Sequence, residues 1–450
     1  MKKENVIKTL EILKEVLIFI LMLICFFLPV IRQFTHSLIF LLKNEYSIIQ
    51  GIGSIGIIAL IAFVIINFKN NKNKKEYLLN ILPIVLFVIF MMWTLISSIL
   101  SQDRYLAFYG TEMRKDGYFT YIAYAGIFSL ALCLKDEKTK KILLNIFVLT
   151  AITIITLVEI RKQGFFTTII WTKDITKGPF FNTNHYGYYL MLGASVTNFL
   201  FIMEKNKALK VIYALSYAYL MYYLIVNNTF GSYLALFVTL LMFFIVAIIK
   251  KEKRVLSLVS IIIFVVISIF TQTAQSINAN KNIKVEKSKN ITSENIKQLS
   301  TDISKISNAN SNPGNNYENA GSGRLILWIN GLKFFAERPM LGYGPENLEI
   351  KYKNIGIIQD RPHNLIIQLL TTSGLPGGIL YITAIGIILI RSLKNIDMSN
   401  TVLIVCMFTA ISYIISSMFG NSMYYTSPYF YIILGMLMKE VVKFKTLKEN

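Results

Sequence analysis

His363 is the residue in this chain best suited to acid–base chemistry. The sequence contains three histidines, and this one follows Pro362 at the point where a long apolar run begins. An imidazole changes its charge near neutral pH without help, so it can accept a proton from an attacking hydroxyl group. Arg361 lies two residues before His363 and Asn364 directly after it. We therefore predict a general base at His363, with anion-binding and orienting groups in the same turn.

Arg324 is a second candidate, because it opens a predicted amphipathic helix after a flexible Gly-Ser-Gly segment. Pro339 ends this helix, whose apolar face consists of Leu325, Trp328, Ile329, Leu332 and Phe335. The free N–H groups of a helix N-terminus attract anions, and a guanidinium group matches phosphate oxygens. A surface arginine is the alternative, although the helix dipole mildly disfavours a cation at this end. The misfit with the dipole favours a phosphate-binding role for Arg324.

Three further polar segments lie beside predicted apolar spans. Residues 109–117 include Arg114, and residues 178–185 include Asn184. The Gly-Tyr-Gly-Pro-Glu-Asn segment at 342–347 predicts a tight turn that holds Tyr343 against the helices. We interpret His185 as an interfacial anchor and His36 as a surface residue.

Two acidic residues near His363, Asp360 and Glu346, are able to orient its ring, but the sequence does not fix their distance from it.

The composition determines which fold must position these groups. Hydrophobic residues make up 54% of the 450 residues, and mean hydropathy is +0.54. Runs long enough to cross a hydrocarbon core of roughly 30 Å recur along the chain. We expect an all-α polytopic membrane protein of about twelve transmembrane helices, near 14–31, 47–66, 78–100, 117–134, 142–160, 184–203, 211–226, 229–249, 255–272, 363–390, 401–418 and 427–438. The turn around Asn227–Phe230 is tight enough that a break within one re-entrant hairpin is an alternative.

Topology follows from the basic residues, because cytoplasmic loops accumulate Lys and Arg. Alternate connections are basic, which predicts a multi-pass protein of the cell membrane with both termini cytoplasmic. The chain then divides into helices 1–9 at 1–272, a large extracytoplasmic loop with short helices at 273–362, and helices 10–12 with a tail at 363–450. Within the loop we expect 276–320 to be mobile and 322–362 to be ordered. A stripe at Ile296, Leu299, Ile303 and Ile306 predicts a short amphipathic helix.

Charge and composition exclude several classes of function. The positive-inside bias and the anionic lipids of the inner leaflet account for the net charge of +21, and nucleic acid is a poor alternative explanation. The three cysteines have no metal-ligand spacing, and no cluster of His and acidic residues predicts a metal. Paired carboxylates for glycoside hydrolysis and a Ser-His-Asp pattern are also missing. We expect neither a metal nor a cofactor.

A family resemblance rests on these motifs taken together. The motif residues are Arg324, Trp328, Pro339, Gly342, Gly344 and His363-Asn364. Their arrangement resembles that of the O-antigen ligases and O-antigen polymerases, which are bacterial membrane glycosyltransferases. The stretch G-P-F-F-N-T-N-H-Y-G-Y-Y-L looks like that family's motif before a central helix. The likeness covers nearly the whole chain, and its individual motifs are degenerate.

The resemblance implies a metal-independent, inverting transfer of a glycan from an undecaprenyl-diphosphate carrier to an acceptor glycan or lipid at the outer face. His363 matches the family's general base, and Arg324 matches an arginine that positions the diphosphate. One departure is that Thr229-Phe230-Gly231 stands where the family often has Ser-Arg-Gly. Arg361 or Arg114 would then replace the missing arginine. Asn364, Tyr343 and Asn184 are predicted to support the site.

Two other classes of function remain open from the sequence. A transporter or flippase of lipid-linked glycans fits the span count, although intramembrane charges are scarce and Glu159 is the main example. A non-catalytic membrane partner, whose large loop only binds, is the other alternative.

Overall fold

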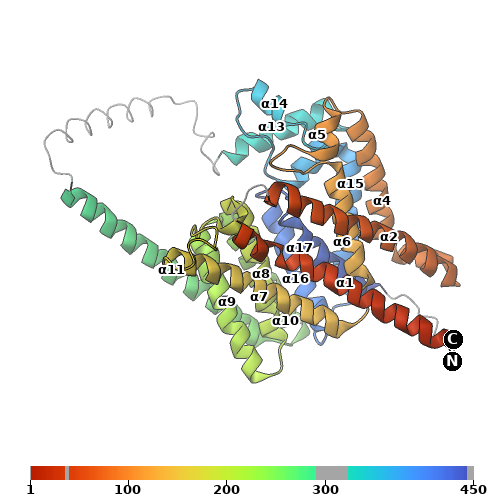
Figure 1. The fold of residues 1–450 in the computed structure, drawn as a ribbon, viewed down its shortest axis with the longest axis horizontal. Coiled ribbons are helices and arrows are strands. Elements are labelled where there is room, and N and C mark those ends of the chain that lie inside the picture. Colours follow the sequence, from red (N-terminus) through yellow and green to blue (C-terminus); the bar gives the residue numbers. More distant parts are fainter. Residues whose placement is uncertain (1, 36–39, 290–322, 443–450) are drawn as a thin grey trace.

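The structure is a computed structural model that describes residues 2–35, 40–289 and 323–442. These residues form helices and connections, with no strand among them. His36 and the stripe at 296–306 lie outside the described residues. The helices (Figure 1) are α1 (Lys2–Thr35), α2 (Tyr46–Asn70), α3 (Lys74–Asn80), α4 (Leu82–Ile99), α5 (Arg104–Tyr109), α6 (Tyr118–Cys133), α7 (Glu137–Lys162), α8 (Thr183–Met203), α9 (Lys207–Asn227), α10 (Phe230–Lys250), α11 (Arg254–Lys289), α13 (Arg324–Glu337), α14 (Glu349–Asn354), α15 (Leu365–Lys394), α16 (Thr401–Ser417) and α17 (Ser427–Val441), with a π-helix at Phe40–Glu45 and a 3₁₀ turn at Gly178–Phe180.

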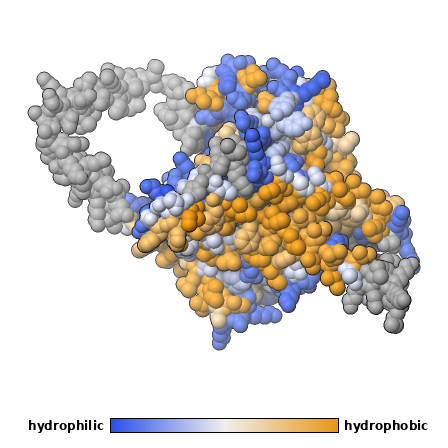
Figure 2. Space-filling model, in the orientation of Figure 1, coloured by the Kyte–Doolittle hydropathy of each residue, from blue (hydrophilic) through white to orange (hydrophobic). Residues whose placement is uncertain are grey.

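The all-helical membrane fold is confirmed. In the described part of the chain, nine helices are long and apolar enough to cross a bilayer. The expected count of twelve is not confirmed, because α6, α16 and α17 coincide with predicted spans but have only 16, 17 and 15 residues. A helix of 16 residues rises about 24 Å, less than a hydrocarbon core of roughly 30 Å. Figure 2 shows hydrophobic residues across the middle of the molecule, with hydrophilic residues toward its upper and lower edges.

The short helices form the centre of the bundle. Nearly every residue of α8, α16 and α17 is buried, and α6 packs against both α2 and α17. Small residues permit these close contacts, as is common between membrane helices. A Cβ atom added at Gly56 of α2 would lie 2.0 Å from the carbonyl oxygen of Gly126 in α6, and one at Gly435 of α17 would lie 2.3 Å from that of Phe128. These helices therefore cross at backbone contact.

The turn between α9 and α10 separates two helices of 21 residues each. Asn228 adopts a left-handed conformation at the end of α9, and the side chain of Asn227 donates to the carbonyl of Thr183 at 2.9 Å. The two helices both have the length and hydropathy of a membrane span. The structure thus forms two helices here and not one interrupted re-entrant hairpin.

The helix before the large loop is longer than the predicted span. Helix α11 continues to Lys289, well past the predicted end of the span at residue 272. The described part of the segment predicted to be mobile is therefore helical, and the rest of that segment lies outside the described residues. Residues 323–362 form α13 and α14, which lie with α5 at one end of the molecule (Figure 1).

The connection between α13 and α14 packs against a break in α15. Gly374 adopts φ 68° inside α15, and Pro376 follows two residues later. Proline has no N–H group, so the carbonyl of Thr372, four residues earlier, loses its helical donor. The N–H group of Gly344 donates to this carbonyl at 2.9 Å, and the Ser97 hydroxyl donates to it at 2.8 Å. The break in α15 and the connection between α13 and α14 therefore satisfy each other's backbone groups.

Neighbouring backbone groups of α15 and of the connection before α14 are hydrogen-bonded to each other in the same way. Tyr343 N–H donates to the Thr371 carbonyl at 2.9 Å, and Leu375 N–H donates to the Pro339 carbonyl at 2.7 Å. A segment of turns is thus fixed to a membrane helix by backbone hydrogen bonds. This holds α13 over the start of α15, where His363 is found.

Candidate active site

His363 lies in the turn that leads into α15. Its backbone has φ 52°, a left-handed conformation that is uncommon for a residue with a side chain. The next residue, Asn364, is the N-cap of α15, and its side-chain oxygen accepts from the N–H group of Ile367 at 3.1 Å. The Asn364 amide nitrogen donates to the Met418 carbonyl at the end of α16, also at 3.1 Å. Asn364 therefore holds the turn in which His363 lies. This placement is compatible with the supporting role predicted for Asn364.

The ring of His363 is partly buried and has one protein partner in the described part of the chain. Its Nδ1 atom lies 2.9 Å from the side-chain amide of Asn421. Burial and the positive charge of Arg361 together lower the pKa of His363 to about 4, while Asp360 opposes the shift. The ring is thus neutral at pH 7, the form that a general base requires.

Arg361 lies at the centre of a buried ionic cluster. Its guanidinium group donates to Asp360 at 3.1 Å, to Asp116 at 3.2 Å, and to Glu346. The Arg361 side chain is 2% exposed, and all three of its donor nitrogens are used. Glu346 also accepts from the hydroxyl of Thr111 at 3.0 Å. This arrangement favours a role for Arg361 in holding the site together over direct contact with a diphosphate, which stays a prediction.

The carboxylates of this cluster differ in their protonation. Burial alone would raise the pKa of Asp360, but Arg361 and Arg114 together lower it to about 2. Burial raises the pKa of Asp116 to about 7, against the opposing effect of Arg361. Arg114 pairs with Asp360 at 2.6 Å and is partly exposed, so it can still reach a ligand. Asp360 and Glu346, which the sequence offered as partners of His363, form their ion pairs with arginines.

Arg324 begins α13, directly after Gly323 with φ 76°. No ion pair of Arg324 occurs within the described ranges, and its positive charge is close enough to lower the pKa of His363. Helix α13 packs tightly on the start of α15, because a Cβ atom added at Gly331 would lie 2.7 Å from the Ile367 side chain. Arg324 is therefore a guanidinium group available to an anion beside His363.

Tyr343 has a structural environment. Its hydroxyl donates to Glu337 at 2.6 Å, and its ring packs with Leu327 and Tyr352 in a small apolar cluster of α13 and α14. Lys351 pairs with the same Glu337 at 2.5 Å. This placement agrees with the prediction that the turn holds Tyr343 against the helices. The support that Tyr343 gives to the site is therefore indirect.

The start of α8 supplies a second buried histidine. Asn182 caps this helix by accepting from the N–H groups of Asn184 and His185, so the capping role belongs to Asn182 and not to Asn184. The Nδ1 atom of His185 lies 2.6 Å from the hydroxyl of Tyr425, and the ring is buried. His185 is within electrostatic reach of His363, which places it beside the site and not at an exposed interface.

Sequence reasoning missed the connection between α16 and α17. Asn421 contacts His363, Ser422 donates to Asp116 at 3.2 Å, and Tyr425 contacts His185. The only signal in the sequence was polar residues in a short link between two apolar runs. Where the family often has arginine, Phe230 begins α10 with 53% of its surface exposed.

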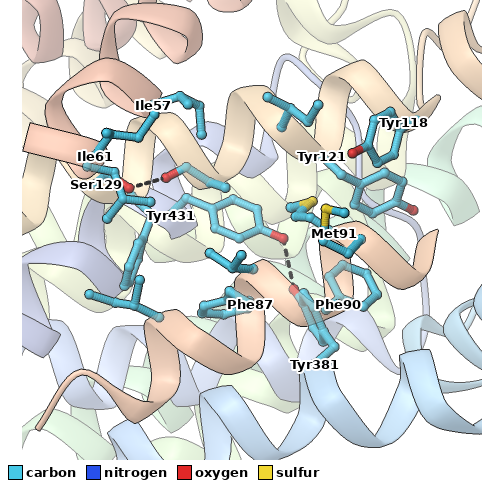
Figure 3. Close-up of a pocket in the computed structure, with 17 residues that line it drawn as sticks. Ile57, Ile61, Phe87, Phe90, Met91, Tyr118, Tyr121, Ser129, Tyr381 and Tyr431 are labelled. Atoms are coloured by element: carbon cyan, nitrogen blue, oxygen red, sulfur yellow. Dashed lines mark hydrogen bonds between the residues drawn. The ribbon is translucent and has the colours of Figure 1, made fainter. Parts of the chain in front are cut away.

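An apolar groove of about 290 Å³ runs between α2, α4 and α6 (Figure 3). Phe87 and Tyr121 contribute to its walls, and the hydroxyls of Tyr381 and Tyr431 are hydrogen-bonded to each other at 2.8 Å. Tyr118 lines one end of the groove, two residues after Asp116. Tyr118 thus connects the lining of the groove, through two residues of chain, to the ionic cluster at Asp116.

The fold and the site together define a class of protein. It is a polytopic helical membrane protein with a neutral histidine and several arginines gathered where helix ends meet. Across the described ranges, no group of three or more His, Cys, Asp or Glu side chains is arranged to hold a metal ion.

Residues 215–382 match the family model of the O-antigen ligase domain, which includes Arg324 and His363. Over this part of its length the chain is similar to the O-antigen ligase family, a match that indicates O-antigen-ligase-like glycosyl transfer at a membrane. None of the curated proteins matches the chain significantly.

Proposed function

We propose that this protein transfers a glycan from an undecaprenyl-diphosphate carrier to a hydroxyl of an acceptor glycan or lipid, at the extracytoplasmic face of the cell membrane. The observation that carries the proposal is a neutral imidazole at His363 beside the guanidinium group of Arg324. A lipid diphosphate is already a good leaving group, so the protein must mainly neutralise charge and accept one proton. Neither step requires a metal ion or a nucleophilic side chain.

The reaction is a single in-line displacement. His363 accepts the proton of the acceptor hydroxyl as its oxygen bonds to the anomeric carbon of the donor sugar. The bond from that carbon to the diphosphate oxygen breaks, and the diphosphate leaves with the electron pair. Attack on the opposite face inverts the configuration of that carbon. The negative charge of the bound diphosphate would raise the pKa of His363 from about 4, which makes it a stronger base in the complex.

The arginines have separate roles in this proposal. Arg324 binds the diphosphate, and Arg114, partly exposed beside Asp360, is the second candidate for that contact. Arg361 stays within its three ion pairs and orients the turn before His363. The apolar groove accommodates part of the hydrocarbon chain of the carrier, since its lining is aliphatic and aromatic.

Sidedness is part of the proposal, because the carrier's diphosphate must reach His363 from outside. The three native cysteines are buried, so a cysteine introduced at position 363 can be labelled selectively. We expect impermeant reagents to label it from the extracytoplasmic side. Labelling from the cytosolic side alone would exclude the proposed site.

The central experiment reconstitutes the purified protein with a defined undecaprenyl-diphosphate oligosaccharide, candidate acceptors and a chelator. Product mass identifies transfer. We expect His363→Ala and Arg324→Ala to abolish it, while Lys333→Ala, an exposed cation on the same helix, retains it. Full activity of both site variants would refute the proposal. Movement of lipid-linked glycan across vesicles by His363→Ala would favour a flippase, and turnover by the pure protein eliminates a purely binding role.

A further inference from the structure

The connection of residues 418–426 between α16 and α17 contacts His363 and three residues around it. It lies outside the matched ligase domain at 215–382. Its backbone and side chains meet Asn364 through Met418, His363 through Asn421, Asp116 through Ser422, and His185 through Tyr425. One short segment thus joins the start of α15, the start of α6 and the start of α8.

The position of Asn421 is fixed by its neighbours. A Cβ atom added at Gly420 would lie 1.2 Å from the Tyr188 hydroxyl, so this residue must be glycine for the segment to lie against α8. The same hydroxyl donates to the Phe419 carbonyl at 3.2 Å. On the other side, the Ser422 hydroxyl donates to Asp116. Asn421 is therefore held from both sides, and it is 6% exposed.

The contact between Asn421 and His363 decides what the imidazole can do. A neutral imidazole carries one proton, on Nδ1 or on Nε2. If the amide nitrogen donates to Nδ1, the proton sits on Nε2, which can then only donate a hydrogen bond. If the amide oxygen accepts from Nδ1–H, the Nε2 lone pair is free to accept a proton. The two amide orientations have the same shape, so hydrogen bonding and chemistry must distinguish them.

One of the two polar atoms of the Asn421 amide lacks a partner in the described part of the chain. In the orientation where nitrogen faces His363, the amide oxygen is buried without a hydrogen bond in the described part of the chain. A buried acceptor left in that state is unfavourable. Turning the amide gives the oxygen a donor, the Nδ1–H group of His363, at the same 2.9 Å separation, and places the amide nitrogen where the oxygen stood. Each orientation leaves one amide atom without a partner in the described residues, so the chemistry decides between them: the turned amide leaves Nε2 of His363 free to accept a proton.

We infer that Asn421 is a positioning residue for His363, whose amide oxygen holds the proton on Nδ1 and leaves Nε2 free to accept the proton of the attacking hydroxyl. This inference rests on the proposed function of His363 as the base. A neutral amide achieves this without adding a charge, which matters because the ring already faces Arg361, Arg114, Arg324 and Asp360. Two further titratable groups lie near this contact: His185, from α8, and Asp116, which accepts a hydrogen bond from Ser422.

The test measures the tautomer and the pH profile separately. The chain has three histidines, so ¹⁵N spectra of histidine-labelled protein are simple, and His363→Gln identifies the relevant signals. In the wild-type protein we expect the Nδ1–H tautomer at His363. Asn421→Ala should give a tautomer mixture and a lower kcat at unchanged KM, by up to the roughly 10²–10⁴-fold that a general base supplies.

Asn421→Asp should raise the pKa of His363 and shift the acid limb of the pH profile upward by about 1–3 pH units. Asn395→Asp makes the same change at an exposed position, and its profile should match the wild type. An Nε2–H tautomer in the wild-type protein overturns the inference without any variant. So does an Asn421→Asp protein whose His363 titration is unchanged. If the tautomer responds to Asn421 while His363→Ala retains transfer, the positioning role stands and the base assignment falls.

Discussion

Replacing Arg361 by alanine should unfold the site before it affects chemistry. The guanidinium group is the shared partner of Asp116, Glu346 and Asp360. Only Asp360 keeps another cation when it is removed, through its pair with Arg114. The other two carboxylates, with side chains 1% exposed, would remain buried without a counter-ion.

The size of the effect follows from burial. Removing one partner of a buried ion pair costs about 3–5 kcal/mol, because the remaining charge stays desolvated. Two carboxylates are affected here, but one can protonate, so we expect about that cost and not twice as much. The pKa of Asp116 is already raised to about 7, and losing Arg361 raises it further. A raised carboxyl pKa destabilises the folded state as pH rises, so the deficit should be large at pH 8 and smaller at pH 5.

Thermal unfolding in detergent at several pH values measures this deficit. Asp116→Asn alone should be mild, since the cluster has three carboxylates and two guanidinium groups. Asp116→Asn combined with Arg361→Ala should recover part of the loss at pH 8. An Arg361→Ala protein with wild-type thermal stability and a raised KM for the lipid-linked donor would refute this reasoning and make Arg361 a diphosphate ligand.

Three further predictions concern the base, the groove and the break in α15. The acid limb of the kcat/KM profile should lie nearer pH 4 than the ordinary histidine pKa of 6.5. The reason is that the pKa of His363 is lowered, so the ring loses its neutral form only as the pH falls toward that lowered pKa. An acid limb at pH 6.5 or above would contradict this. Ala125→Trp should fill the groove and raise KM for long-chain carriers more than for short ones, whereas Ile58→Trp, at a position 69% exposed on α2, should not; equal effects would exclude the groove. Gly342→Ala should lower the unfolding free energy by at least about 1–2 kcal/mol, because φ is 68° and the new Cβ would lie 2.6 Å from the Thr372 backbone; thermal unfolding checks this.

The sequence by itself determined the class of protein and two principal candidates for its chemistry. Long apolar runs must form membrane helices, because a bilayer leaves no water to pair with backbone groups. Each predicted span coincides with a helix, although three of these helices are short. Arg324 and His363 could be selected because each stands at a helix start, where local patterns of glycine, proline and apolar residues are readable.

Tertiary structure decided which partners these residues have. Asn421 follows His363 by 58 positions, and Asp116 precedes Arg361 by 245. No local pattern reports contacts over such separations, since they depend on how the helices pack. The same packing buries Arg361 among three carboxylates. It leaves Arg324 beside His363, without an ion pair in the described residues. Both arginines stand near helix starts, so the sequence does not reveal this difference between them.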